Sequence, residues 1–178
     1  MTVHVREMDR ATDRAAVEAI DTSFETSAIY DIVVTARRID LVERRLDQPL
    51  VKRYPMADAF ADWSTWDTAF VALVDGAICG FAAVEYEAWH RRLVLWHFYV
   101  SPQRRKMGVG RALAERVEAH GRERRAHHVW LETTNVNVPG IAAYERLGYS
   151  LCGADHTLYE GLPYANEAAL YLAKSLRG

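Results

Sequence analysis

The stretch "VSPQRRKMGVGRAL", residues 100–113, joins an apolar run to a helical pattern. It contains one proline, two glycines and four basic residues, which is more than a simple turn requires. Free N–H groups and the helix dipole attract anions to the start of a helix, and glycines let the anion approach the backbone. The stretch therefore predicts a strand, an anion-binding loop and a helix, in that order.

Two well-known phosphate loops do not fit this stretch. The P-loop pattern G-x-x-x-x-G-K-[ST] is absent, and a dinucleotide fingerprint would need a third glycine where Leu113 stands. We expect the loop to bind a pyrophosphate, but not that of NAD.

Outward from the loop, hydrophobic periodicity predicts the neighbouring elements. The dipeptide Asp75-Gly76 marks a hairpin turn, Asp13 is expected to cap the first helix, and residues 29–55 give no clear pattern. The expected elements are a strand at 2–8, a helix from 13 to 20, strands at 69–74, 77–89 and 91–101, a helix at 109–125, a strand at 127–134, a helix at 137–148 and closing elements at 149–160 and 167–176.

This order predicts an α+β fold. The strands at 92–101 and 127–134 are joined by a helix long enough for a parallel crossover, while the earlier strands form hairpins. We expect a mixed, mostly antiparallel sheet with a central splayed parallel strand pair, flanked by helices. Residues 1–178 are expected to form a single domain.

Composition limits the class of protein. The 178 residues are 50% hydrophobic with a formal net charge of −2, whereas general nucleic-acid binders are more often basic. The two cysteines, Cys79 and Cys152, show no metal-ligand spacing, and no run approaches the ~18 apolar residues of a membrane span. We expect a cytoplasmic monomer or homodimer with no metal and no nucleic-acid or membrane partner.

Two motifs resemble the GNAT superfamily of N-acetyltransferases. Residues 105–110, "RKMGVG", fit the family's R/Q-x-x-G-x-G/A signature after a strand. Residues 131–149, "LETTNVNVPGIAAYERLGY", resemble its second conserved block. The resemblance implies the GNAT fold, acetyl-CoA as co-substrate and an acetyl-CoA-binding core at about residues 69–150.

The resemblance also implies site residues. Main-chain groups of the strand before the loop would pair with the pantetheine arm, loop amides would bind the pyrophosphate, and Tyr144 would direct its hydroxyl at the sulfur. The implied cofactor-binding residues are Phe98, Tyr99, Val100, Arg105, Lys106, Met107, Gly108, Val109, Gly110, Arg111, Asn137 and Tyr144.

Acetylation of an amine requires a proton acceptor for the ammonium form, a donor for the developing oxyanion and an acid for the leaving thiolate. The amide near Val100 is a candidate donor, and Tyr144 is the candidate acid. The base stays open between Glu132, acting through water, and His97, which strict alternation directs to the face opposite Val94 unless a bulge turns it.

The tail at residues 153–176 resembles that of streptothricin acetyltransferases, which acetylate an amine of a cationic antibiotic. The chain departs from them at Trp96 and His97, where acidic residues are common. A small cationic amine is therefore the leading acceptor; protein or peptide N-acetylation and a non-catalytic acyl-CoA sensor stay open as alternatives. Candidate substrate-binding residues are Glu85, Glu87, Trp89, Asp155 and Glu160.

Overall fold

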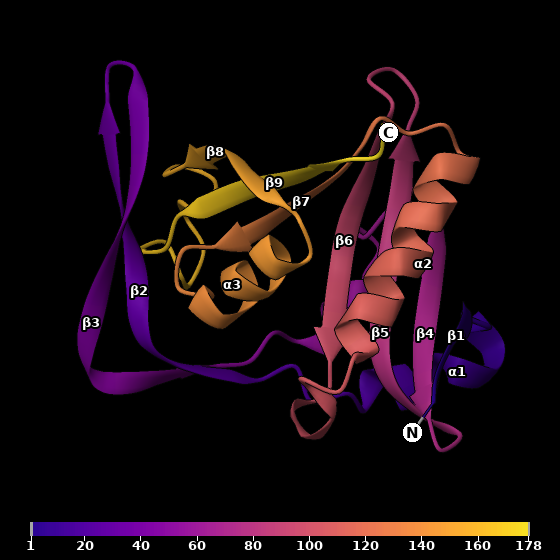
Figure 1. Ribbon diagram of the computed structural model, residues 1–178. Helices are drawn as coiled ribbons and strands as arrows, with labels where there is room; N and C mark the ends of the chain where they lie inside the picture. Colours follow the sequence, from indigo (N-terminus) through magenta and orange to yellow (C-terminus); the bar gives the residue numbers. More distant parts are fainter. Residues whose placement is uncertain (1, 178) are drawn as a thin grey trace. The chain divides into compact units, whose positions relative to one another are not determined.

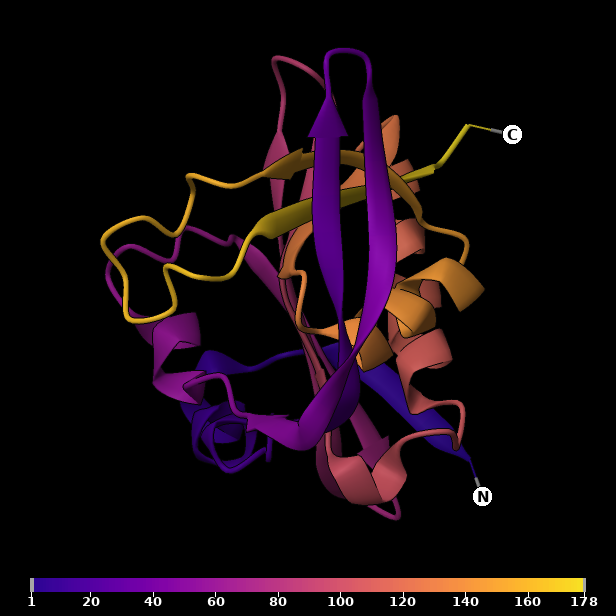
Figure 2. The same ribbon diagram turned by 90° about the vertical axis from the view of Figure 1, so that its left-hand side faces the viewer.

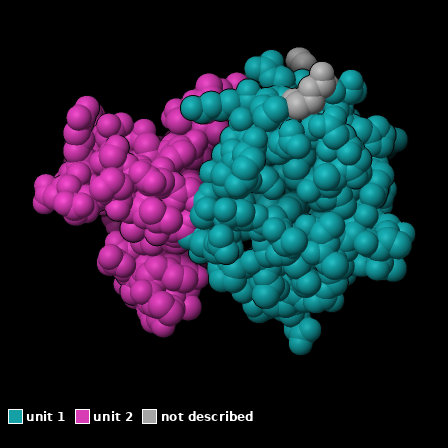
Figure 3. Space-filling model, turned by 90° about the horizontal axis from the view of Figure 1, so that it is seen from below, with its two compact units in different colours: residues 1–23, 53–129, 175–178 teal, residues 24–52, 130–174 magenta. Residues whose placement is uncertain are grey.

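The computed structural model describes residues 2–177, and the chain divides into two compact units (Figure 3). Unit 1 comprises residues 1–23, 53–129 and 175–178, and unit 2 comprises residues 24–52 and 130–174. The elements are β1 (Val3–Glu7), α1 (Arg10–Glu18), β2 (Phe24–Thr35), β3 (Arg38–Lys52), η1 (Met56–Phe60), β4 (Thr68–Val74), β5 (Ala77–Glu87), β6 (Arg92–Val100), η2 (Pro102–Arg104), α2 (Val109–Glu123), β7 (His128–Thr134), α3 (Val138–Arg146), β8 (Ser150–Asp155) and β9 (Ala169–Ser175).

In unit 1 the strands β1, β4, β5 and β6 pair in that order, each antiparallel to the next. The β4–β5 hairpin turns at Asp75 and Gly76, whose φ angles are +52° and +80°. An Asp-Gly pair adopts this left-handed backbone at low cost, so the predicted hairpin is confirmed at its predicted turn.

Helix α2 covers one face of this sheet and runs along β4, β5 and β6 (Figure 1). A Cβ atom on Gly80 would lie 2.8 Å from Leu113 Cδ1 and 3.1 Å from Val109 Cγ1. The helix therefore lies close to β5 because Gly80 has no side chain. This contact fixes the start of α2 beside the end of β6.

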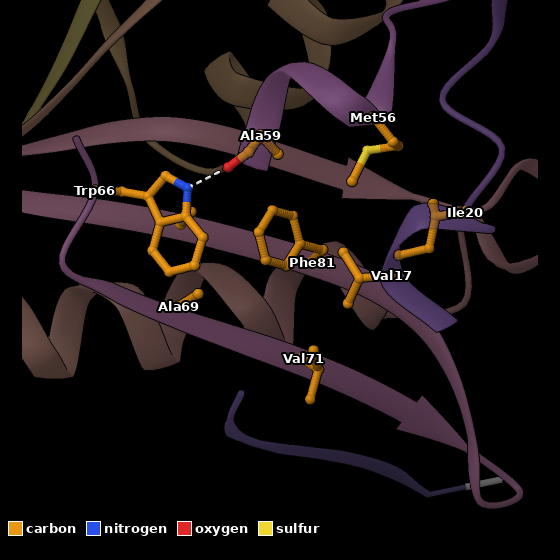
Figure 4. Close-up of a cluster of buried hydrophobic side chains, with 9 residues drawn as sticks. Val17, Ile20, Met56, Ala59, Trp66, Ala69, Val71 and Phe81 are labelled. Carbon is orange, nitrogen blue, oxygen red and sulfur yellow. Dashed lines mark hydrogen bonds between the residues drawn. The ribbon is translucent and has the colours of Figure 1, made fainter. Parts of the chain in front are cut away.

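The other face carries the buried cluster of Figure 4, to which α1, η1 and the sheet contribute. Phe81 is fully buried near its centre, and Trp66 lies edge-on to it with ring centroids 6.1 Å apart. The Trp66 indole donates a hydrogen bond of 2.6 Å to the Ala59 carbonyl, so its one polar atom is satisfied inside the core.

The predicted cap of α1 is wrong. Asp9 is the N-cap, and its side chain accepts hydrogen bonds from the amides of Ala11 and Thr12. Asp13 lies inside the first turn, where it is buried and forms a 2.6 Å ion pair with Arg6 on β1. The alternation of residues along β1 does not indicate that Arg6 contacts Asp13. The hydrogen bonds from Arg6 lower the pKa of the Asp13 carboxyl.

Unit 2 contains most of residues 29–55, the segment for which the sequence pattern predicted no secondary structure. Residues 24–52 form the long β2–β3 hairpin, a twisted two-stranded ribbon (Figure 2). Strands β7, β9 and β8 are neighbours in that order, with β8 antiparallel to β9, and an open loop joins β8 to β9. Asn135 ties the hairpin to this group, because its amide donates to the Tyr30 carbonyl at 2.7 Å and accepts from Ala168 N at 2.9 Å.

Candidate functional site

The loop after β6 presents backbone N–H groups at the start of a helix. Gly108 is the N-cap of α2 with φ +85°, and no side chain caps it. The first intrahelical donor is Ala112 N, which bonds to Gly108 O at 3.0 Å, so the amides of Val109, Gly110 and Arg111 precede it. These amides and the helix dipole are the groups to which the sequence assigned an anion, and binding of an anion there stays a prediction.

Space around the two glycines suits a phosphate. A Cβ atom at Gly108 would meet no protein atom within 4 Å, and one at Gly110 would only touch Phe98 and Val100 at 3.8 Å. The glycines are therefore not required by packing against the protein. Their absence of side chains leaves the backbone open to a ligand, and the loop fits the pyrophosphate group that the motif implied.

Arg105 stabilises the loop itself. Its Nε donates to the Val100 carbonyl at 3.0 Å and its guanidinium donates to the Ser23 carbonyl at 2.6 Å. Burial lowers the pKa of Arg105 from its ordinary value, yet the group stays charged at neutral pH. Lys106 and Met107 are exposed beside it, and Lys106 holds a left-handed φ of +62°.

A bulge in β6 decides the direction of His97. Ala83 on β5 pairs with His97 and Val84 pairs with Leu95, so Trp96 is the extra residue. Glu85 pairs with Val94, and Ala83 and Glu85 share a face of β5. His97 and Val94 therefore lie on the same face of the sheet. Strict alternation would place them on opposite faces, and the bulge is what reverses the direction of His97.

His97 is buried among core side chains. Its Nε2 lies 3.3 Å from Ser64 Oγ, and its ring centroid lies 6.4 Å from that of Phe81 and 6.0 Å from that of Tyr99. Burial lowers the pKa of His97 to about 4. The ring is neutral at pH 7 and a weak proton acceptor.

The acids predicted on β5 already have partners. Glu85 accepts from Thr65 Oγ1 at 2.7 Å and from the Trp96 indole at 2.9 Å. Glu87 lies 2.8 Å from His90 Nε2. Trp89 is 85% exposed and stacks on His90 with ring centroids 4.0 Å apart. The structure thus brings Glu87 and Trp89 together around His90.

Glu132 on β7 occupies a crowded polar site in unit 2. The residue keeps exposed surface, but its Oε1 accepts a hydrogen bond from the Tyr159 hydroxyl. Burial of the carboxylate raises its pKa, the Tyr159 hydrogen bond and the charge of Lys52 lower it, and Glu167 raises it. Burial is the largest of these effects, so the pKa of Glu132 lies above its ordinary value.

Tyr144 and Asn137 belong to α3, also in unit 2. Asn137 is the N-cap: its Oδ1 accepts from Gly140 N at 3.1 Å and its Nδ2 donates to Thr133 Oγ1 at 3.0 Å. Tyr144 is half-buried, and its ring lies edge-on to Tyr149 with centroids 5.8 Å apart. The cap fixes the start of α3 and thereby the turn that carries Tyr144.

Asp155 holds a turn. Its Oδ1 accepts from the amides of Thr157 and Leu158 and from Thr157 Oγ1, while Tyr171 donates to its Oδ2 at 3.4 Å. These hydrogen bonds, above all those from Thr157, lower the pKa of Asp155. Glu160 is exposed in the same loop.

A group of side chains around Glu132 was missed as a unit. We call it the acidic cluster, and its members are Lys52, Trp130, Glu132, Asp155, Tyr159, Glu167 and Tyr171. Within it Lys52 forms an ion pair with Glu167, and the Tyr171 ring stacks on Trp130 with ring centroids 5.2 Å apart. Asp155, Tyr159 and Glu167 lie in the tail whose resemblance was noted, so part of the signal was present. Nothing in the sequence pointed to Lys52 or Trp130 as residues of a site.

Among residues 2–177, no cluster of three or more His, Cys, Asp or Glu side chains could hold a metal ion. Across the same residues, every helix is too short or too polar to span a bilayer.

Comparison with known proteins identifies the family. A profile of the acetyltransferase (GNAT) family matches residues 28–149. Streptothricin acetyltransferase of Streptomyces lavendulae is 42% identical over 171 residues, which cover 92% of this chain and 90% of that protein. The chain belongs to the GNAT acetyltransferase family. It is an acetyltransferase that takes its acetyl group from acetyl-CoA.

Solved structures agree with this assignment. The crystal structure of nourseothricin acetyltransferase superposes with a TM-score of 0.89 at 38% identity, covering 99% of this chain and all of that one. A Bacillus anthracis protein in complex with acetyl coenzyme A has a TM-score of 0.83 at 24% identity and covers 98% of this chain. The GNAT fold is α+β, with a mixed sheet of parallel and antiparallel strands flanked by helices, and the predicted fold class is confirmed.

Proposed function

We propose that this GNAT acetyltransferase acetylates an amine of a streptothricin-type antibiotic. One observation carries the proposal: the chain is 42% identical to streptothricin acetyltransferase over 92% of its length. The 38% identity to nourseothricin acetyltransferase, over 99% of the chain, supports it. Such a reaction removes a positive charge from the antibiotic and explains a role in resistance.

The chemistry of unit 2 supports a cationic acceptor. The acidic cluster contains three carboxylates and one lysine, and Lys52 neutralises Glu167. Glu132 and Asp155 remain as net negative charge beside the stacked Trp130 and Tyr171 rings. Carboxylates next to aromatic faces attract ammonium groups through charge and cation–π interaction.

The donor, when bound, supplies an acetyl group activated as a thioester. In unit 1, the amides of Val109, Gly110 and Arg111 would bind its pyrophosphate, and main-chain groups of Phe98 to Val100 would pair with its pantetheine arm. Lys106 would add outer charge. Arg105 would act by holding the loop, because its guanidinium is bonded to Val100 and Ser23.

Of the two candidate bases, we assign the role to Glu132. A general base works best when its pKa lies near the working pH. Burial raises the pKa of Glu132 toward that range, whereas burial lowers the pKa of His97 to about 4 and weakens it as a base. Glu132 would accept a proton from the substrate ammonium, directly or through water, and Tyr144 would donate its hydroxyl proton to the leaving thiolate.

Cellular location follows as a further part of the proposal. Cys79 is buried, Cys152 is exposed, and no disulfide joins residues of the described part of the chain. Reduced thiols suit the cytoplasm. The protein is proposed to act there as a monomer or homodimer.

Thiol release from acetyl-CoA tests the proposal. Purified protein is assayed with nourseothricin, an aminoglycoside, simple amines and N-terminal peptides, and the acetylated product is identified by mass spectrometry. We expect turnover with nourseothricin and the addition of one acetyl group. Turnover with peptides but not with the antibiotic would replace the proposal with peptide acetylation, and binding of acetyl-CoA without turnover of any acceptor would replace it with a sensor.

A further inference from the structure

Tyr159 is a buried residue in an otherwise exposed loop. Residues 156–166 lie between β8 and β9, and every one of them except Tyr159 is exposed. Tyr159 is 7% exposed, and its hydroxyl donates to Glu132 Oε1 on β7. Burial of the ring anchors the loop, and a buried tyrosine hydroxyl needs a hydrogen-bond partner; here that partner is a carboxylate that is itself a candidate base.

The loop is built to hold Tyr159 in place. Asp155 accepts hydrogen bonds from Thr157 N at 2.7 Å and Leu158 N at 3.2 Å, directly before Tyr159. The Tyr159 carbonyl accepts from Leu162 N at 3.0 Å, and the Tyr164 ring lies edge-on to the Tyr159 ring with centroids 5.2 Å apart. Backbone and ring are thus both restrained, and the hydroxyl is directed at one carboxylate oxygen.

Charged groups from several elements act on Glu132. Lys52 of β3 forms an ion pair with Glu167, which precedes β9. The charge of Lys52 lowers the pKa of Glu132, and the charge of Glu167 raises it. Asp155 at the end of β8 and Tyr171 on β9 belong to the same group. Burial raises the pKa of the Tyr171 phenol, and the charges of Asp155 and Glu132 raise it further. Tyr159 and Lys52 are the two groups that favour the charged carboxylate against the effect of burial.

We propose that Tyr159 is a positioning residue of the acetyl transfer: its hydroxyl fixes Oε1 of Glu132 and keeps the carboxylate charged, which leaves Oε2 to take the proton of the substrate ammonium. The inference rests on the proposed function. In the proton step the N–H bond of the ammonium breaks, its electron pair stays on nitrogen as the nucleophilic lone pair, and an O–H bond forms on Glu132. Charge is conserved, since an ammonium and a carboxylate become an amine and a carboxylic acid.

The test is the pH dependence of kcat/KM for nourseothricin in wild type and Tyr159→Phe. Phenylalanine keeps the ring and removes only the hydroxyl, so protonation of Glu132 becomes easier and the acidic limb of the profile moves to higher pH. We expect a loss of about tenfold or more at the acidic end, because a hydrogen bond to a charged group contributes on that order, and recovery as the pH rises. Tyr164→Phe is the matched control: it removes a neighbouring hydroxyl from the same loop and should keep the wild-type profile.

A readout without turnover separates this inference from the proposed function. Carbon-13 NMR of labelled glutamate follows the titration of Glu132, assigned with Glu132→Gln, and should show a higher pKa in Tyr159→Phe than in wild type. An unshifted titration, or a loss of activity equal at every pH, would reduce Tyr159 to a packing residue and overturn the inference. Wild-type protein that titrates as expected but does not acetylate the antibiotic would contradict the proposed function and, with it, the catalytic role of the Tyr159–Glu132 pair.

Discussion

The loop at residues 101–110 and the acidic cluster are built in opposite ways. The loop consists of backbone: its amides start α2, and Gly108 allows a φ of +85° with open space where a side chain would be. The cluster consists of side chains drawn from β3, β7, β8, β9 and the loop between β8 and β9. A site made of backbone tolerates changes of charge but not of conformation, whereas a site made of side chains depends on each functional group.

The largest effect is expected from Gly108→Val. A β-branched residue is strained at this left-handed φ, and its side chain would occupy the place proposed for the phosphate. Isothermal titration calorimetry should detect no acetyl-CoA binding. Gly76→Val is the matched control, because Gly76 has φ +80° and equally open space in the β4–β5 turn. If both variants bind acetyl-CoA equally well, the loop does not hold the cofactor through its backbone.

Tyr144→Phe should have the next largest effect. It keeps the ring that packs against Tyr149 and removes the hydroxyl proposed as the general acid. A general acid contributes roughly 10²- to 10⁴-fold to the rate, so kcat should fall by that factor while acetyl-CoA binding stays at the wild-type level. Tyr86→Phe serves as a hydroxyl-deletion control in unit 1. A kcat within threefold of wild type, with chemistry limiting the rate, would leave Tyr144 as a packing residue.

His97 is buried in unit 1, and burial moves it toward its neutral form. For His97 the folded state disfavours the charged ring, so the unfolded chain binds the proton more tightly between pH 6.5 and about 4. Stability is therefore complete above pH 6.5 and falls as the pH decreases, by about 3 kcal/mol over that window. Urea unfolding of wild type and His97→Gln at several pH values should show a shallower pH dependence in the variant. Replacing the exposed His4 by Gln should leave the dependence unchanged, and an equal slope in all three proteins would contradict the burial argument.

The smallest effect is expected from Lys106→Ala. Lys106 is exposed, and a surface charge contributes about two- to fivefold to binding of an anion. Affinity for acetyl-CoA should fall by that factor and become less sensitive to salt. Lys106→Gly is a useful second variant, because glycine removes the charge without strain at φ +62°. A loss as large as that of Gly108→Val would show that charge, rather than backbone geometry, holds the cofactor.

Of the loop at residues 101–110 and the acidic cluster, local features of the sequence were sufficient to predict the conformation of the loop. The Asp75-Gly76 turn, the loop at 101–110 and the start of α2 each depend on residues a few positions apart, where steric rules of the backbone decide the conformation. The family resemblance extended that prediction to the fold and to the reaction, and both are confirmed.

Tertiary structure decided the rest. The bulge at Trp96 follows from the register with β5, and the α1 cap moved to Asp9 because Asp13 pairs with Arg6 on another element. Glu132 meets Tyr159 across 27 residues, and Lys52 meets Glu167 across 115. Such partners depend on how distant segments pack. Glu132, Tyr159 and Glu167 lie in stretches that the resemblance covers, but their local sequence does not indicate which side chains they contact. The sequence alone determined where the chain can present its backbone to an anion, whereas only the folded chain determined which side chains share a site, because burial and charge act through space and not along the chain.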